Sequence, residues 1–418
     1  MAMIGGFLLA IIKLLVILCI VATIHEFGHF LAAKLFKIGV NEFSIGFGPK
    51  IFQKKKNDTL YSLRWVPLGG YVMIEGEGEQ SDKENSFSKQ HPFKRIIVLV
   101  MGVVFNLILG FLVLTSISFF IPVYTTEITE IAETSPLKDS GILVGDKITK
   151  INGEKVVFAN ELIITNYDGP SDVVLEYVRN DEKKYAVVSG AKVNIGYIGV
   201  AFKTIDGNPS NEVNYTQAGS VAEQTNIKSD DIITAVNGTE VKSATEIISI
   251  IQKNAGKNVE LTVLRNGNEQ NISIVPDSQS RLDLGILNTK EEKSNIYYAL
   301  TKAVKAIGEV IGSYAELFKG NVGINDVSSI VGIGVVVSQT SGIIEYLNML
   351  AIISLAVGAA NILPFVPLDG GKIIFVVYEW ITKKKVSEKV EVVTSYIGWG
   401  LLMLLTIVVM FKDVINIF

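Results

Sequence analysis

A long apolar run that leads into the sequence His-Glu-Phe-Gly-His at residues 25–29 most constrains what this chain can fold into. Residues 4–24 contain Lys13 as their only charged residue, and apolar residues resume after the motif. About twenty consecutive apolar residues are enough for a helix to cross a lipid bilayer. Ionisable residues inside such a segment are costly and normally have a function. The sequence therefore predicts a membrane-spanning helix that carries a functional polar cluster.

The spacing of two histidines in this motif predicts a metal site. His25 and His29 are two of the three histidines in the chain. Residues four apart lie on the same face of a helix, so both imidazoles can bind one zinc ion. Glu26 is then placed to take a proton from a water at the metal, as the general base of a hydrolase.

Four apolar stretches are long enough to span a bilayer, at about residues 5–33, 96–121, 343–381 with an interruption, and 393–411. We interpret the first as a retained span and not a signal peptide, because it lacks a small-residue cleavage site and a basic n-region. Lysine and arginine are abundant in the loops after the first and third spans, which predicts that both loops are cytoplasmic. Both termini and residues 123–340 are then expected outside the membrane of a bacterial cell.

Charge and cysteine usage exclude other classes of site. The net charge of −4 gives no indication of nucleic-acid binding. Cys19 is the only cysteine, so neither an internal disulfide nor a thiolate zinc site is expected. A thiol in apolar surroundings stays protonated, which argues against a nucleophilic role.

The outer segment contains an internal repeat. Residues 145–153 read Gly-Asp-Lys-Ile-Thr-Lys-Ile-Asn-Gly, and a related sequence recurs 85 residues later at 230–238. Each copy is followed by an alternating apolar and polar stretch that ends in Arg-Asn, which predicts small half-buried sheets. The pattern resembles PDZ domains. We expect PDZ-like modules at 123–203 and 204–290, which either bind peptide ligands or serve as spacers.

The interrupted third span supplies a candidate for the third metal ligand. Residues 361–371 read Asn-Ile-Leu-Pro-Phe-Val-Pro-Leu-Asp-Gly-Gly, and their prolines and glycines break the backbone hydrogen-bond ladder within the membrane. Asp369 would be an unpaired carboxylate there, which fits a metal ligand, a cap on the half-helix that follows, or both. His91 is a poorer candidate, because it precedes a proline in a polar loop.

The expected depths of the two halves of this site agree. His29 lies eight residues before Lys37, and Asp369 lies fourteen before Lys383. At about 1.5 Å per residue, these separations are roughly 12 and 21 Å from basic flanks that face the cytoplasm. Both groups are thus expected in the cytoplasmic half of the bilayer or near its middle.

Together these motifs resemble the site-2 protease family of intramembrane zinc metalloproteases, in its bacterial RseP-type branch with two PDZ domains. The resemblance covers essentially the whole chain and includes the segments 42–49, 67–72 and 102–106. It implies that Zn²⁺ is bound and that Glu26 is the general base. The implied zinc ligands are His25, His29 and Asp369. Asn106 and Asn361 are implied to hold the substrate or the transition state, although Asn106 can equally well bond neighbouring helices.

A small sheet after the first span is a candidate substrate-binding element. Residues 40–47 and 60–74 alternate well enough to pair, and a free edge could bind an unwound substrate by β-strand addition. Gly46 would allow close backbone approach next to Phe47. The alternative is that this sheet only plugs the membrane face of the site.

The expected fold is a polytopic α-helical membrane protein with four transmembrane helices, the third one broken, a small membrane-associated β-sheet and two extracytoplasmic PDZ-like α+β domains. Residues 293–318 are expected to form an amphipathic helix on the bilayer surface or beneath the PDZ-like modules. The expected divisions are 1–38 with the first span, 39–94 as a cytoplasmic β-hairpin and loop, 95–122 with the second span, 123–203 and 204–290 as the two modules, 291–342 as an amphipathic helix and linker, 343–382 with the broken span, and 383–418 with a loop and the fourth span.

This organisation predicts regulated intramembrane proteolysis of single-span membrane proteins, such as anti-sigma factors or remnant signal peptides, with the PDZ-like modules filtering substrates. The alternatives are an inactive membrane-tethered PDZ scaffold and a zinc transporter. An intact ligand and base set argues against the scaffold, and a transporter would need several polar spans.

The family commonly has Ser-Gly-Pro-Val-Gly-Ile before the third span, whereas residues 328–333 read Ser-Ser-Ile-Val-Gly-Ile. This departure bears on substrate entry and leaves the metal ligands untouched.

Overall fold

The computed structural model describes residues 2–78, 81–205, 208–217, 219–319, 327, 329–339 and 342–417. The chain divides into two compact units. The first unit combines the segment up to Ile121 with Ser294–Asn416, and the second is Pro122–Lys293. Each unit is described by itself.

The first unit is built mainly from helices. They are α1 (Ala2–Leu35), α2 (Pro92–Phe120), α5 (Ile296–Phe318), α6 (Ile330–Gln339), α7 (Ile343–Ile362), α8 (Asp369–Thr382) and α9 (Glu388–Ile417), with a short 3₁₀ helix at Phe87–Lys89. Helices α1, α2, α7 and α9 are each long and apolar enough to cross a membrane, in agreement with the four predicted spans. Helix α6 lies where the sequence pattern predicts only a linker.

Helix α5 lies where the sequence predicts an amphipathic helix, and its apolar side packs against other helices of the first unit. Its fully buried Ala303 packs in one apolar cluster with Leu114 of α2 and Leu355 of α7. The helix therefore packs against two of the spanning helices within the first unit. A small alanine side chain permits this close approach, which the apolar periodicity alone does not reveal.

The third apolar segment is interrupted between α7 and α8, as its prolines and glycines predict. Pro364 and Pro367 lie in the six residues between the two helices and have no N–H to donate. A Cβ on Gly370 would collide with the carbonyl oxygens of Ile362 and Leu363. The chain therefore folds back closely on the end of α7 before α8 begins.

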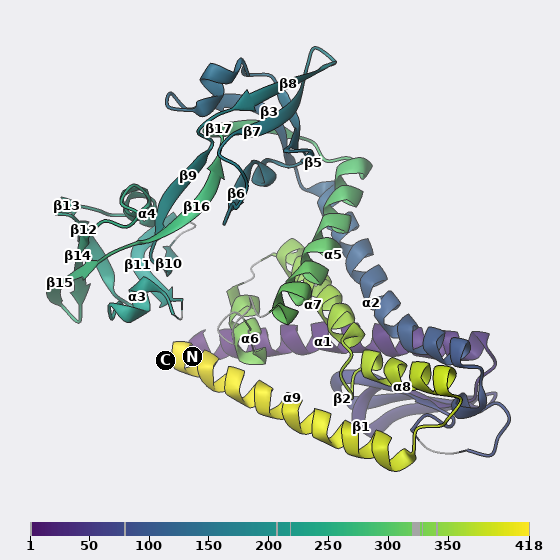
Figure 1. Cartoon of the computed structure of the whole chain (residues 1–418). Helices are drawn as coiled ribbons and strands as arrows, with labels where there is room; N and C mark the ends of the chain where they lie inside the picture. The colour runs from purple at the N-terminus through teal and green to yellow at the C-terminus, as the bar shows by residue number, and fades with distance from the viewer. Residues whose placement is uncertain are drawn as a thin grey trace. The chain divides into compact units, whose positions relative to one another are not determined.

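Helices α1 and α2 cross in close contact at two glycines. A Cβ on Gly28 of α1 would collide with the carbonyl oxygen of Met101, and a Cβ on Gly102 of α2 would collide with the ring of His29. Small residues at such crossings let helix backbones approach within lipid. Figure 1 shows α2 crossing α1, with α7 alongside α2.

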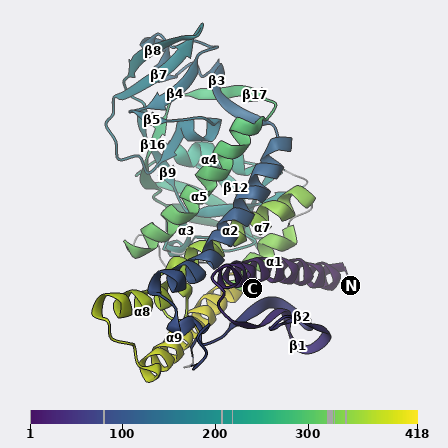
Figure 2. The ribbon, with the colours of Figure 1, turned by 90° about the vertical axis from the view of Figure 1, so that its right-hand side faces the viewer.

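A β-hairpin follows α1 and lies against it (Figure 2). Strand β1 (Val40–Lys56) pairs antiparallel with β2 (Thr59–Ile74) through a register interrupted by several bulges. The first strand extends beyond the expected 40–47, because a turn at Asn57, with φ of 51°, lets residues 50–56 pair as well. The predicted sheet is thus present, as a longer hairpin.

The second unit contains two similar sheets joined by a third (Figure 1). The first sheet contains β3 (Val123–Ile131), β4 (Lys147–Ile151), β5 (Glu154–Lys155), β7 (Val173–Arg179), β8 (Glu182–Val188) and β17 (Ile286–Glu292). The second contains β10 (Val200–Ile205), β11 (Asn208–Thr216), β12 (Ile232–Val236), β13 (Thr239–Glu240), β14 (Val259–Arg265) and β15 (Asn268–Ile274). The third contains β6 (Ile163–Thr165), β9 (Lys192–Tyr197) and β16 (Asp277–Asp283), and the short helices of this unit are α3 (Val221–Gln224) and α4 (Ala244–Gln252).

The two apolar cores of this unit exchange segments. The core of the first sheet includes Leu282 and Leu284 from the end of the second repeat. The core of the second sheet includes Ile198, which precedes the second repeat. The expected boundary between residues 203 and 204 does not follow this division, because the sequence repeat locates the turns and not the strands that complete each core.

The repeat also preserves a buried ion pair. Arg179 donates to both oxygens of Asp146, and Arg265 donates in the same way to Asp231. Both aspartate side chains are only 1% exposed. The bidentate geometry satisfies carboxylates that would otherwise be buried without a charge partner.

We expect Arg179→Ala to lower the free energy of unfolding of the second unit, because it leaves the Asp146 carboxylate buried and unpaired. Arg265→Ala should have a similar effect through Asp231. Lys183→Ala is the control, because this lysine is 68% exposed and lies 3.8 Å from Glu176. Amide hydrogen exchange in β4 and β12 measures the losses, and equal exchange in all three variants would contradict the expectation.

Candidate metal centre

Three side chains from distant parts of the chain form one buried cluster. The Nε2 atoms of His25 and His29 lie 3.1 Å apart. Asp369 Oδ2 lies 3.0 Å from the first and 3.2 Å from the second. All three residues are less than 9% exposed. Among the described residues, this is the one group of histidine, cysteine and acidic side chains close enough to share a metal ion.

The geometry of this cluster fits zinc. Tetrahedral zinc with bonds of about 2.0–2.1 Å places its ligand atoms about 3.3 Å from one another. The three separations of 3.0–3.2 Å are close to that value. Asp369 Oδ2 is buried and has no hydrogen-bond partner, so a cation would compensate it. Three protein ligands leave one coordination position open, which is the pattern of catalytic zinc sites.

The second nitrogen of each histidine ring faces a group that fixes its orientation. His29 Nδ1 lies 2.8 Å from the carbonyl oxygen of Val98 in α2, and donation of its N–H there leaves Nε2 free for a metal. His25 Nδ1 lies 3.4 Å from the side-chain amide of Asn106, whose Oδ1 has no partner. With the amide turned so that Oδ1 faces the ring, Nδ1 donates and His25 Nε2 is likewise free.

The crossing of α1 and α2 creates the space for these rings. Gly102 lies directly beneath both imidazoles, and a Cβ there would lie 2.8 Å from His25 Cε1 and closer still to His29 Nε2. Asn106 follows one helical turn later and is fully buried. The Gly102 and Asn106 positions of α2 therefore support the two histidines of α1.

Glu26 lies beside the cluster and lines a cleft that opens from it. One of its oxygens, Oε2, accepts the backbone N–H of Val72 in β2 at 3.0 Å. The cleft has a volume of about 580 Å³ and is also bounded by His29 and Asp369. Its other walls come from β2 and α9, with the lining residues Tyr71, Val72, Met73, Ile74, Val392, Ser395, Tyr396 and Trp399. A peptide segment in this cleft would lie between a strand edge and an aromatic helix face.

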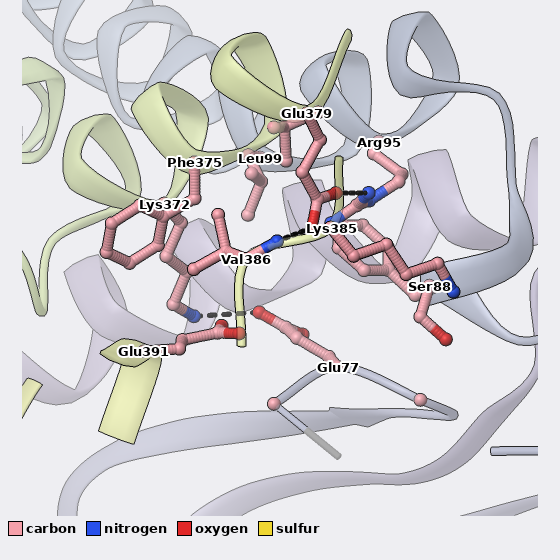
Figure 3. Close-up of a pocket in the computed structure, with 14 residues that line it drawn as sticks. Glu77, Ser88, Arg95, Leu99, Lys372, Phe375, Glu379, Lys385, Val386 and Glu391 are labelled. Atoms are coloured by element: carbon pink, nitrogen blue, oxygen red, sulfur yellow. Dashed lines mark hydrogen bonds and ion pairs between the residues drawn. The ribbon is translucent and has the colours of Figure 1, made fainter. Parts of the chain in front are cut away.

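A charged network lies in a pocket next to the cleft, and three of its residues, Glu77, Lys372 and Glu391, line both (Figure 3). Lys372 lies one turn after Asp369 on α8, and its Nζ pairs with Glu77 Oε1 at 2.7 Å. Glu391 of α9 lines the cleft beside this ion pair. Deeper in the adjoining pocket, Arg95 of α2 pairs with Glu379 of α8 at 2.5 Å. These pairs join α2, α8 and the segment after β2.

The other candidate residues, Asn361 and Gly46, contact the backbone of α7 and of the hairpin, respectively. Asn361 donates from Nδ2 to the carbonyl oxygen of Val357 within α7, and its role toward a substrate stays a prediction. Gly46 has φ of 82°, and a Cβ there would lie 2.9 Å from the carbonyl oxygens of Arg64 and Val66. The close backbone approach expected at Gly46 therefore occurs within the hairpin itself.

Phe47 packs beside a residue of the cleft, whereas His91 lies at the N-terminus of α2. Phe47 stacks on Tyr71, a residue that lines the cleft, with ring centroids 5.9 Å apart. His91 caps the N-terminus of α2 by accepting the N–H of Phe93, and its ring meets Trp380 edge to face. A capping histidine outside the cluster agrees with its rejection as a ligand.

The segment that departs from the family pattern lies at the start of α6. Ser328 lies outside the described residues. Ser329 donates its N–H to Asp413 Oδ2 of α9 at 2.6 Å, and its Oγ accepts the N–H of Val331 at 3.1 Å. The serine therefore caps α6 and connects it to the C-terminal part of α9.

Sequence reasoning did not identify Val72 or Lys372 as residues of the site. The signal for Val72 was available in Gly69-Gly70, which indicates that a backbone approaches closely nearby. Lys372 lies three residues after Asp369 on α8. Residues at this spacing are neighbours on a helix face, so Lys372 is expected near Asp369.

Comparison with known proteins gives matches along nearly the whole chain. The model of peptidase family M50 matches residues 13–405. The chain is 27% identical to the regulator of sigma-W protease RasP of Bacillus subtilis, covering 99% of this chain and 100% of that protein. It is 26% identical to the zinc metalloprotease RasP of Oceanobacillus iheyensis, covering 96% and 97% of the two chains. It is 27% identical to the zinc metalloprotease RasP of Geobacillus kaustophilus, covering 98% of each.

Two solved structures of an HtrA-type protease align with only about a quarter of the chain. The HtrA-type protease AlgW with decapeptide aligns with 27% of this chain and 53% of its own, at 12% identity and a TM-score of 0.20. A similarity at this level does not establish a shared fold.

We expect Gly102→Ala to weaken zinc binding by more than about tenfold, because the added methyl group displaces the His29 imidazole and α2 cannot retreat from its contact at Gly28. Gly308→Ala on α5 is the matched control, because a Cβ there meets open space. Zinc content per purified protein, measured by mass spectrometry over a range of free zinc, gives the affinity. Equal affinity in the two variants would show that the ring positions do not depend on this glycine.

Proposed function

The chain belongs to peptidase family M50, the site-2 protease family of zinc metalloproteases, and from this premise we propose that it cleaves single-span membrane proteins within the bilayer. The observation that carries the proposal is the buried cluster of two imidazoles and one carboxylate between α1 and α8. In this proposal, the zinc ligands are His25, His29 and Asp369, and Glu26 is the general base. The four apolar helices make the chain a multi-pass membrane protein, and the ligands lie within its apolar helical unit.

The residues of this chain divide the chemistry between them. His25, His29 and Asp369 would hold zinc, which when bound would act as a Lewis acid toward water and the scissile carbonyl. Glu26 takes the proton from the attacking water and later passes it to the leaving amine. Asn106 holds His25 in the tautomer that leaves Nε2 free. The Asn361 amide donates one N–H to the carbonyl oxygen of Val357, and its second N–H can donate to the developing oxyanion.

Substrate binding follows from the shape of the cleft. The backbone carbonyls of a transmembrane helix are hydrogen-bonded and covered by side chains, so cleavage needs local unwinding. Strand β2 lines the cleft from Tyr71 to Ile74, and in the described part of the chain its residues 70–74 pair with β1 on one side only. An unwound substrate can therefore bind by β-strand addition, with Phe47 and Gly46 supporting the wall behind Tyr71.

The second unit supplies selection in this proposal. Its two similar sheets act as PDZ-like modules on the extracytoplasmic side, either by binding peptide ends or by blocking substrates with bulky outer domains. Substrates are then single-span proteins that have lost their outer domain, such as anti-sigma factors or remnant signal peptides. The hairpin and its flanking loop lie on the cytoplasmic side, as the lysine and arginine distribution indicates, and both termini lie outside.

The central test is Glu26→Gln in purified protein. We expect this variant to bind zinc at the wild-type level and to lose cleavage of a single-span model substrate by at least about a thousandfold, because the water has no base. Zinc content and cleavage in detergent or liposomes are measured on the same samples. Metal-independent cleavage would remove the zinc protease mechanism. Zinc flux without cleavage would favour a transporter, and binding of substrate with no cleavage by the wild type would favour a scaffold.

Removal of residues 125–290 tests the filtering role. We expect this variant to cleave substrates with intact outer domains that the full chain rejects, while it cleaves trimmed substrates at a similar rate. Cleavage of the two substrate classes is compared in liposomes. If a variant that inserts and binds zinc fails on the trimmed substrate, the second unit contributes to catalysis and the filtering proposal is wrong.

A further inference from the structure

One hydrogen bond connects the hairpin to the general base. The backbone N–H of Val72 in β2 donates to Oε2 of Glu26 in α1, at 3.0 Å across 46 residues of sequence. This bond is charge-assisted when the carboxylate is ionised, and such bonds are shorter and stronger than neutral ones. The two histidines are oriented by α2, so this bond joins a different element to the site.

Two glycines explain how β2 comes close enough to make this bond. A Cβ on Gly69 would lie 3.0 Å from Cβ of Ala22, and a Cβ on Gly70 would lie 3.4 Å from Oγ1 of Thr23. The added atom on Gly70 would also lie 2.6 Å from the carbonyl oxygen of Ser44 in β1. A larger residue at Gly69 would press against Ala22 of α1, and a larger residue at Gly70 would collide with β1. The glycine pair therefore holds the strand against the turn of α1 that precedes Glu26.

The Val72 N–H leaves the edge of β2 that faces away from β1. Successive backbone groups of a strand point to alternate edges, so residues an odd number apart point in opposite directions. Three residues later, the N–H of Glu75 donates to the carbonyl oxygen of Gly39, on the side where β1 begins. Glu26 thus occupies a hydrogen-bonding position on the very edge that lines the cleft.

We propose that the Val72 N–H is a positioning group for Glu26. It fixes one carboxylate oxygen, so that the other oxygen is the one presented to the water at the metal. The proposal rests on the proposed protease function and adds the element that aims its base. It also limits β-strand addition: the edge position at Val72 is already used, so a substrate pairs with the other outward groups of β2.

A matched pair of variants separates this role from a general structural one. Val72→Pro removes the N–H, and proline is tolerated on an edge strand where the N–H points away from the ladder. Val72→Ala loses most of the side chain but keeps the N–H, so it is the reference. We expect the kcat of the proline variant to be at least about tenfold below that of the alanine variant, with KM within about twofold and equal zinc content.

Two kinetic outcomes would overturn the proposal. Equal kcat in the two variants would mean that the base does not need this hydrogen bond. A raised KM with unchanged kcat would mean that the N–H serves the substrate instead. If the proline variant does not fold, an ester bond in place of the amide at residue 72 removes the same N–H with little change in backbone shape, and the same comparison applies.

A second measurement does not depend on cleavage. Amide hydrogen exchange at Val72 should be at least about tenfold faster in Glu26→Ala than in the wild type, because the acceptor is lost. The Glu75 amide, which donates to Gly39, is the internal control. Unchanged exchange at Val72 would overturn the proposal. Wild-type protein that protects Val72 but cleaves nothing would instead count against the proposed function and leave the hydrogen bond established.

Discussion

The close crossing of α1 and α2 is the contact on which the rest of the site depends. Gly28 and Gly102 let two backbones meet where apolar side chains would otherwise separate them. Because of this contact, the carbonyl oxygen of Val98 and the amide of Asn106 reach the outer nitrogens of the two imidazoles. Polar groups buried among apolar helices are costly unless they have partners, and α2 supplies the partners of the two histidines.

Strand β2 and the segment that follows it are tied to both helices that carry the candidate metal ligands. Val72 bonds Glu26 on α1, and Glu77, a few residues further along, pairs with Lys372 on α8. Lys372 in turn lies one turn from Asp369. The strand and the residues after it therefore contact both helices that contribute to the cluster, and these contacts fix the cleft-facing edge of β2 relative to it.

The sequence predicts those parts of the site that depend on a motif and its spacing. The helical spacing of His25 and His29 and the isolated carboxylate of Asp369 in a broken span suffice to bring the three together as candidates. The longer hairpin was not predictable, because Gly46, Gly48 and the lysine run before Asn57 are typical of a loop. Helix α6 and the bond from Val72 to Glu26 depend on tertiary contacts, with Asp413 and with α1, that no local pattern records.

The exchange of segments between the two cores has a consequence for biosynthesis. Leu282 and Leu284 complete the first apolar core, although that core begins near residue 128. A nascent chain cannot close this core until both repeats have been synthesised. The repeats are therefore expected to assemble together at a late stage, and a chain that stalls between them would present an open apolar surface to chaperones and degrading enzymes.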